Sequence, residues 1–188
     1  MMLSGILVGA SNAYHKAKDE ESVELVWTGP NTGLVSVRRT EQALLEVIEA
    51  ANKELFLISF VAYEVPSIKK ALNEAVDRNV KVAMLIESSE AHGGQNQADC
   101  VGNMRAAVPG ATVYVWSTSS KDSEGGGYRI VHAKVAVADG KVAFITSANL
   151  SPAAMEKNME LGVLVRGDRL PGRLQEHFKA LITTKVIL

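Results

Sequence analysis

The stretch IVHAKVAVADGKVAFITSANLS, residues 130–151, decides both the fold class and the candidate site. Its two apolar runs flank Asp139-Gly140, a dipeptide typical of tight β-hairpin turns because both residues tolerate positive φ. The first run also carries His132 and Lys134. Burying either charge is costly unless it is paired or used, so this strand is expected to serve a function.

The hairpin predicts which polar side chains meet. A two-residue loop pairs residue 138 with 141 and, counted outward, places Ser147 directly across from His132. Because side chains alternate between the faces of a strand, we expect His132, Lys134, Ser147 and Asn149 on one face. A β-bulge would shift this register by one residue. The lysine, serine and asparagine suit a phosphate, and an imidazole acts as a nucleophile or a general acid or base.

Two carboxylates near this face have different expected roles. Asp139 lies at the turn and falls on the opposite face by parity, so we expect it to be structural. An imidazole nucleophile needs one nitrogen free and the other held by a carboxylate. Glu160 begins the strand predicted after the hairpin and is the candidate for that role.

Helix and strand patterns alternate upstream of the hairpin. The patterns predict strands over residues 22–27, 54–61, 80–87, 112–116 and 160–166, and helices over 40–53, 66–79, 101–107 and 170–182. This alternation is typical of an α/β fold with a mixed β-sheet flanked by helices. We expect residues 1–21 to form a helical N-terminal segment and residues 22–188 to form one domain.

The composition excludes some classes of protein. The chain has 188 residues, which suits one domain, and a net charge of −1, which disfavours a broadly basic nucleic-acid binder but allows a local basic cleft. A lone cysteine, Cys100, cannot form an internal disulfide and fits the reducing cytoplasm. Apolar runs fall short of the roughly 18 residues of a transmembrane helix, so we expect no membrane association.

Polar residues of the hairpin and of the following strand share an order and spacing with a known family. They resemble the HKD signature of the phospholipase D superfamily, through His132-x-Lys134-x4-Asp139, Ser147-x-Asn149 and Asn158-x-Glu160. The likeness covers residues 37–182, and Thr146 stands where the family usually has glycine. It implies a phospholipase D-like fold with one HKD motif per chain.

The resemblance also implies a phosphodiesterase that needs no metal and no other cofactor. His132 would form a phosphohistidine or protonate the leaving group. Lys134 and Asn149 would bind the phosphoryl oxygens. Ser147 would support the phosphate or the histidine, and Glu160 would orient His132 through Nδ1.

A single motif has a consequence for assembly. The family normally uses two motifs in one site, and its single-motif members close the site by homodimerisation, so the resemblance implies a two-fold homodimer. Those members include bacterial endonucleases, which implies a nucleic-acid substrate. The stretches LVWTGP, VRRTEQ and LISFVAYEVPSIKKAL also resemble the phospholipase D-like component of the DISARM anti-phage defence system, with other defence-system proteins as partners.

Other interpretations of the site residues remain open. His132 and Lys134 are also compatible with a partly buried pair in an inactive domain, and His132, Asp139 and Glu160 with a metal site, although Asp139 faces the wrong way. Arg38 and Arg39 are candidate cleft-lining residues that would grip a nucleic-acid phosphate or pair with neighbouring carboxylates. Tyr63 is a third cleft-lining candidate, because it follows a central strand.

Two other functions compete with a nuclease. One is a non-hydrolytic module that binds a nucleic acid or a phosphate within a defence complex. The other is a phospholipid hydrolase, which the lack of an amphipathic basic helix or a hydrophobic loop disfavours.

Overall fold

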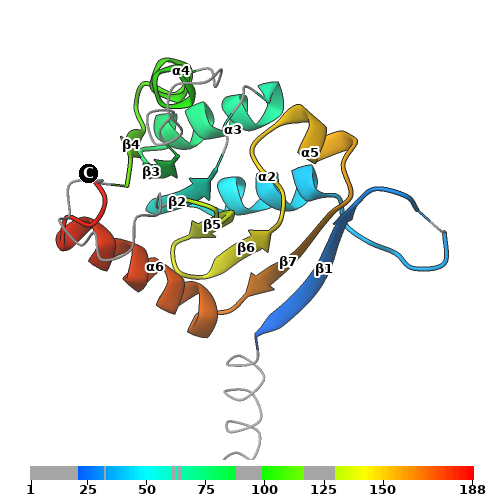
Figure 1. The fold of residues 1–188 in the computed structure, drawn as a ribbon. Helices are drawn as coiled ribbons and strands as arrows, with labels where there is room; N and C mark the ends of the chain where they lie inside the picture. Colours follow the sequence, from blue (N-terminus) through cyan, green and yellow to red (C-terminus); the bar gives the residue numbers. More distant parts are fainter. Residues whose placement is uncertain (1–20, 32, 61, 63–64, 88–98, 117–129) are drawn as a thin grey trace, which may run out of the picture.

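The computed structural model describes residues 21–31, 33–60, 62, 65–87, 99–116 and 130–188. These residues form a seven-stranded mixed sheet with helices on both faces (Figure 1), which confirms the predicted fold class. Of the helical N-terminal segment expected over residues 1–21, only Glu21 is among the described residues. Tyr63 is also outside the described residues.

The elements follow the predicted order, with one unpredicted short helix, α5. The strands are β1 (Ser22–Thr28), β2 (Glu54–Ser59), β3 (Lys81–Ile86), β4 (Thr112–Tyr114), β5 (Val135–Ala138), β6 (Val142–Thr146) and β7 (Glu160–Arg166). The helices are α2 (Thr40–Ala50), α3 (Pro66–Asp77), α4 (Cys100–Ala107), α5 (Pro152–Glu156) and α6 (Arg169–Thr183). No helix in the described ranges is both long enough and apolar enough to cross a membrane.

The sheet order is β1-β7-β6-β5-β2-β3-β4. Strands β2, β3 and β4 run parallel, with α3 and α4 between them in the chain, whereas the remaining neighbours are antiparallel. Strand β1 pairs with β7, although the two strands are far apart in the sequence and no local sequence pattern predicts that they meet.

Two apolar layers hold the helices against the sheet. Alternation along β5 sends Ala136 and Ala138 into the layer under α2 and α3, and Val137 into the layer under α6. In that second layer the rings of Phe56 and Phe178 stack with centroids 4.7 Å apart. The hairpin therefore lies in the middle of the sheet with both faces covered.

This topology brings several strand ends to one edge of the sheet. Strands β1, β2, β3 and β6 point the same way, and β5 and β7 point the opposite way. The carboxyl ends of the first four therefore meet the amino ends of β5 and β7. His132 and Lys134 precede β5, Ser147 follows β6, and Glu160 begins β7, so all four lie at this edge.

Candidate active site

The hairpin has a longer loop than the sequence predicted. Ala138 pairs with Val142 rather than with residue 141, so the loop is Asp139-Gly140-Lys141 and the register shifts by one residue. Asp139 and Gly140 both have positive φ, 51° and 62°, and the Lys141 N–H donates to the Ala138 carbonyl at 2.8 Å. The predicted placement of Ser147 directly across from His132 is therefore wrong.

The residue across from Lys134 is Thr146, whose N–H donates to the Lys134 carbonyl at 3.1 Å. Thr146 stands where the family usually has glycine, and a glycine on the neighbouring strand offsets the added bulk. A Cβ built on Gly162 would lie 3.0 Å from the Thr146 Cβ and 2.6 Å from the Phe144 ring. The Thr146 side chain occupies space that a side chain at position 162 would need. A side chain at position 146 is therefore compatible with glycine at position 162.

Lys134 is a buried cation, with 7% of its surface exposed. Its ammonium donates to the His132 carbonyl oxygen at 2.7 Å and lies 5.9 Å from the centroid of the Phe60 ring. Burial lowers the pKa of Lys134 below its ordinary 10.5, and the negative charge of Glu160 acts in the opposite direction by favouring the ammonium. The ammonium is therefore held in a site where its charge is weakly screened.

His132 is exposed, immediately beside this buried cation. Its ring lies 5.6 Å from the Phe60 ring, centroid to centroid, and its Nδ1 lies 3.3 Å from the Lys134 ammonium. An ammonium has donors only, so Nδ1 is the acceptor in this contact and the proton of the neutral ring lies on Nε2. Sequence reasoning missed Phe60, although its place just after a central strand was a usable signal.

Glu160 is 8% exposed and begins β7. One carboxylate oxygen accepts from the Ser147 hydroxyl, and the other accepts from the Asn158 amide at 3.1 Å. The Ser147 oxygen in turn accepts from the Leu161 N–H at 3.2 Å. A bend at Ser147, directly after β6, brings this hydroxyl to Glu160.

The expected contact between Glu160 and Nδ1 of His132 is replaced by these bonds. Both carboxylate oxygens are engaged by Ser147 and Asn158, and Nδ1 faces Lys134 instead. The negative charge of Glu160 favours the ammonium of Lys134, and that ammonium contacts His132. The signature residues thus form two contacting pairs, Ser147 with Glu160 and Lys134 with His132, and the charge of Glu160 acts on Lys134.

Asn149 contributes a polar group to the interior. Its side-chain oxygen is buried without a hydrogen-bond partner in the described structure. Unsatisfied buried acceptors are rare and costly, so this amide is the part of the candidate site whose hydrogen bonding is incomplete.

Asp139 holds the turn to a neighbouring loop. Its carboxylate accepts from the backbone N–H groups of Asn52, Lys53 and Glu54 at 2.8, 3.0 and 2.8 Å. Burial alone would raise the pKa of Asp139, but these three donors and the Lys53 charge outweigh it, and the pKa lies below its ordinary value. The geometry gives Asp139 a structural role at the sheet edge opposite the site.

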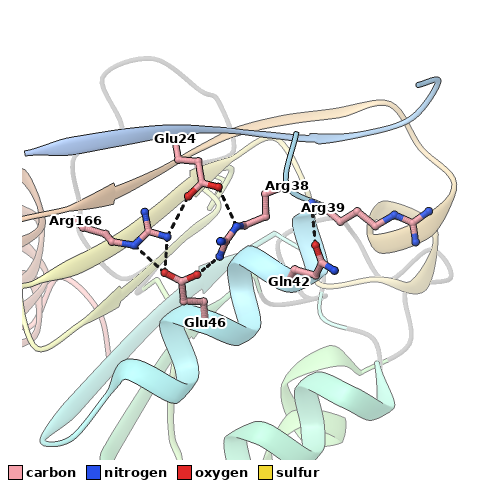
Figure 2. Close-up of polar contacts among 6 residues, drawn as sticks. All are labelled: Glu24, Arg38, Arg39, Gln42, Glu46 and Arg166. Atoms are coloured by element: carbon pink, nitrogen blue, oxygen red, sulfur yellow. Dashed lines mark hydrogen bonds and ion pairs between the residues drawn. The ribbon is translucent and has the colours of Figure 1, made fainter. Parts of the chain in front are cut away.

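Arg38 belongs to a cluster of four charges (Figure 2). It pairs with Glu24 at 3.0 Å and with Glu46, and Arg166 pairs with the same two carboxylates at 3.0 and 2.5 Å. The guanidinium of Arg38 is thus engaged by carboxylates, which is the alternative left open for it by the sequence. Arg39 is exposed, and Figure 2 shows its side chain pointing away from the cluster.

The metal alternative lacks a matching set of ligands. Asp139 lies at the far turn, and the described ranges contain no group of three or more His, Cys, Asp or Glu side chains placed to hold a metal ion. The third cleft-lining candidate, Tyr63, is outside the described residues.

Comparison with known proteins identifies the family of this chain. The family described as "Cardiolipin synthase, PLD-like domain" matches residues 44–182, which include the hairpin and the Glu160 strand. This chain belongs to the phospholipase D-like family. The resemblance drawn from the signature residues is therefore confirmed, and the family is one of phosphodiesterases.

Among phospholipase D-like relatives, the DISARM protein DrmC of Bacillus paralicheniformis is 29% identical over 161 residues, covering 84% of this chain and 62% of DrmC. A cardiolipin synthase of Listeria innocua is 22% identical, covering 86% of this chain and 31% of that protein. The chain thus spans less than two thirds of the length of these relatives.

Solved structures share the phospholipase D-like fold. NucT from Helicobacter pylori superposes with a TM-score of 0.67 at 20% identity, covering 87% of this chain and 97% of NucT. Nuc from Salmonella typhimurium superposes with a TM-score of 0.57 at 24% identity, covering 86% of this chain and 93% of Nuc.

Proposed function

We propose that this chain is a metal-independent phosphodiesterase that cleaves DNA through a phosphohistidine intermediate on His132. The observation that carries the proposal is the exposed imidazole of His132 beside the buried ammonium of Lys134. A substrate can reach the imidazole, which is a competent nucleophile. The ammonium is placed to stabilise the negative charge that develops on the phosphoryl oxygens.

The reaction takes two steps. In the first, Nε2 of His132 attacks phosphorus, a P–N bond forms, and the P–O bond to the leaving group breaks while a second imidazole protonates the leaving oxygen. In the second, water attacks phosphorus, the second imidazole takes the water proton, and the P–N bond breaks. His132 is thereby regenerated and a phosphate ester is released.

The second imidazole is assigned to His132 of another copy of this chain. The described part of the chain holds one further histidine, His177, which lies on α6. A two-fold homodimer would place one exposed His132 opposite its symmetry mate, so that one attacks and the other acts as the acid. This assembly supplies both imidazoles from a chain that carries one signature.

Two observations support a nucleic-acid substrate and a role in anti-phage defence. The single signature resembles that of superfamily members which include bacterial endonucleases, and this favours a nucleic acid over a lipid headgroup. The likeness to the DISARM protein DrmC supports a role in defence, alongside other proteins of such a system. We place the protein in the cytoplasm, where the buried thiol of Cys100 stays reduced.

A second candidate is a module that binds a nucleic-acid phosphate without cleaving it. One observation favours it: the carboxylate oxygens of Glu160 are engaged by Ser147 and Asn158, so Nδ1 of His132 is not held by a carboxylate. Nδ1 instead accepts from Lys134, so the neutral imidazole has its proton on Nε2. Protonated Nε2 is not yet a nucleophile.

One experiment separates the candidates. Solution mass is measured by light scattering, and the protein is then incubated in EDTA with single-stranded DNA, duplex DNA, RNA, a chromogenic phosphodiester and phospholipid vesicles. A dimer that cleaves DNA supports the proposal. Binding of DNA with no cleavage of any substrate favours the binding module, and hydrolysis of lipid alone favours a phospholipid hydrolase.

A further inference from the structure

Glu87 is a buried carboxylate that none of the roles above uses. It directly follows β3 and is 5% exposed. Its Oε2 accepts a hydrogen bond from the backbone N–H of Val131 at 2.5 Å. Taking a carboxylate out of water is costly, so a buried glutamate bonded to a backbone group indicates a conformation that the fold must specify.

The bond acts on the residue next to the proposed nucleophile. Residues 130–134 precede β5, which begins at Val135, and the first cross-strand backbone hydrogen bond after His132 is the one from the Thr146 N–H to the Lys134 carbonyl. Glu87 anchors the backbone directly before His132. The Lys134 ammonium holds the His132 carbonyl oxygen at 2.7 Å, directly after it.

The side chain of Val131 strengthens the first anchor. Val131 is 5% exposed and belongs to the apolar layer under α6, together with Leu85 on β3 and Phe178 on α6. One residue thus has its side chain in the core and its N–H on a buried carboxylate. A charge-assisted bond of this kind is roughly twice as strong as a neutral one.

We propose that Glu87 is a positioning residue for His132: by fixing the N–H of Val131, it sets the height and direction at which the imidazole leaves the sheet edge. The inference rests on the proposed function, because it is the attack by His132 that needs this geometry. A misplacement of about 1 Å at a reacting group costs on the order of 100-fold in rate. Glu87 touches no reacting atom and acts only through the backbone.

The test compares Glu87→Ala, which removes the acceptor, with Glu87→Gln, which keeps a carbonyl oxygen in the same place and removes the charge. Ile86→Ala is the matched control, because Ile86 is 1% exposed on the adjacent position of β3 and packs in the other apolar layer. We expect Glu87→Ala to lower kcat by about 10- to 100-fold with KM changed less than about threefold. Glu87→Gln should restore most of kcat, and Ile86→Ala should lose stability but keep kcat.

A second readout does not depend on activity. Hydrogen exchange of the Val131 amide, followed by NMR, should be slow in the wild type and in Glu87→Gln and at least about tenfold faster in Glu87→Ala, with a shifted His132 ring resonance. Equal exchange and an unshifted ring in Glu87→Ala would overturn the inference, as would a fall in kcat of the same size in Ile86→Ala.

The two proposals fail in different ways. If the wild type cleaves no phosphodiester, the proposed function fails, and the exchange rates and the ring resonance still decide whether Glu87 sets the position of His132. If the wild type cleaves DNA but Glu87→Ala keeps full kcat, the proposed function stands and the positioning role is refuted.

Discussion

The ammonium of Lys134 lies 3.3 Å from Nδ1 of His132 and 2.7 Å from the carbonyl oxygen of the same residue. This contact makes Nδ1 an acceptor and leaves the proton of the neutral ring on Nε2. Attack through Nε2 needs the opposite tautomer, so Lys134 must leave Nδ1 when a phosphate binds. The substrate would then draw the ammonium to its own oxygens and free the imidazole for attack.

The tautomer of His132 can be observed directly. We expect ¹⁵N NMR of the imidazole at neutral pH to show the Nε2–H form in the protein alone and the Nδ1–H form with saturating vanadate or a thiophosphate diester. Lys134→Met lacks the donor, so its ring should show a smaller share of the Nε2–H form than the wild-type ring. A ring that stays in the Nε2–H form with the anion bound would count against the nucleophile and in favour of the binding module.

Glu160→Gln should change the pH profile of cleavage. The Glu160 charge favours the ammonium of Lys134, against the lowering of its pKa by burial, so removing that charge lowers this pKa further. The ammonium is then lost at a lower pH, and the alkaline limb of kcat/KM moves to lower pH. If the variant is inactive, the ¹³Cε shift of Lys134 gives the same titration. An alkaline limb and a titration that stay in place would refute the coupling.

Asp139→Ala should reduce stability and spare the chemistry. Three backbone N–H groups lose a charged acceptor, and the expected loss is about 2–3 kcal/mol of the free energy of unfolding. Because this turn lies at the sheet edge opposite His132, kcat should stay within about twofold below the melting temperature. Urea denaturation and initial rates measure the two effects. A stable but inactive variant would place Asp139 in the site instead.

The four-charge cluster predicts a pH-dependent contribution to stability. Hydrogen bonding to Arg166 is the largest influence on Glu24 and lowers its pKa below the ordinary 4.5, although burial opposes the shift. A carboxyl with a lowered folded pKa stabilises the fold above its unfolded pKa and loses that effect as pH falls through the folded value. Glu24→Gln should therefore cost up to about 1 kcal/mol at pH 7, since these side chains are partly exposed, and much less near pH 3.

Glu49, an exposed carboxylate on α2, offers the control for that comparison. Glu49→Gln removes a carboxylate outside the four-charge cluster and gives the baseline with which the Glu24→Gln deficit is compared at each pH. If Glu24→Gln lowers the free energy of unfolding as much at pH 3 as at pH 7, the shape of the Glu24 side chain explains the loss and its charge does not.

Local patterns predicted the α/β class, because buried strands and amphipathic helices carry distinct periods along the chain. They misjudged the hairpin register. In the folded chain Asp139 is held by residues 52–54, which are far away in sequence, and the loop has three residues. For the same reason the pairing of β1 with β7 and the bond from Val131 to Glu87 were not predictable from local sequence.

The signature did not predict how its residues bond to one another. Ser147 reaches Glu160 through a bend beyond the end of β6, which strand alternation does not describe. The Lys134 ammonium is buried and donates to the carbonyl oxygen of His132, two residues earlier in the chain. Spacing fixes which strand ends meet, whereas the contacts depend on side-chain burial and charge that only the folded chain shows.

The most direct test of covalent catalysis by His132 is the initial rate of DNA cleavage in EDTA by the wild type and by His132→Ala, with both proteins shown to be folded and of equal solution mass. We expect cleavage by the wild type and at least about a 10³-fold lower rate in the variant, because loss of a catalytic nucleophile lowers kcat by several orders of magnitude. Cleavage by His132→Ala at the wild-type rate would contradict covalent catalysis by His132.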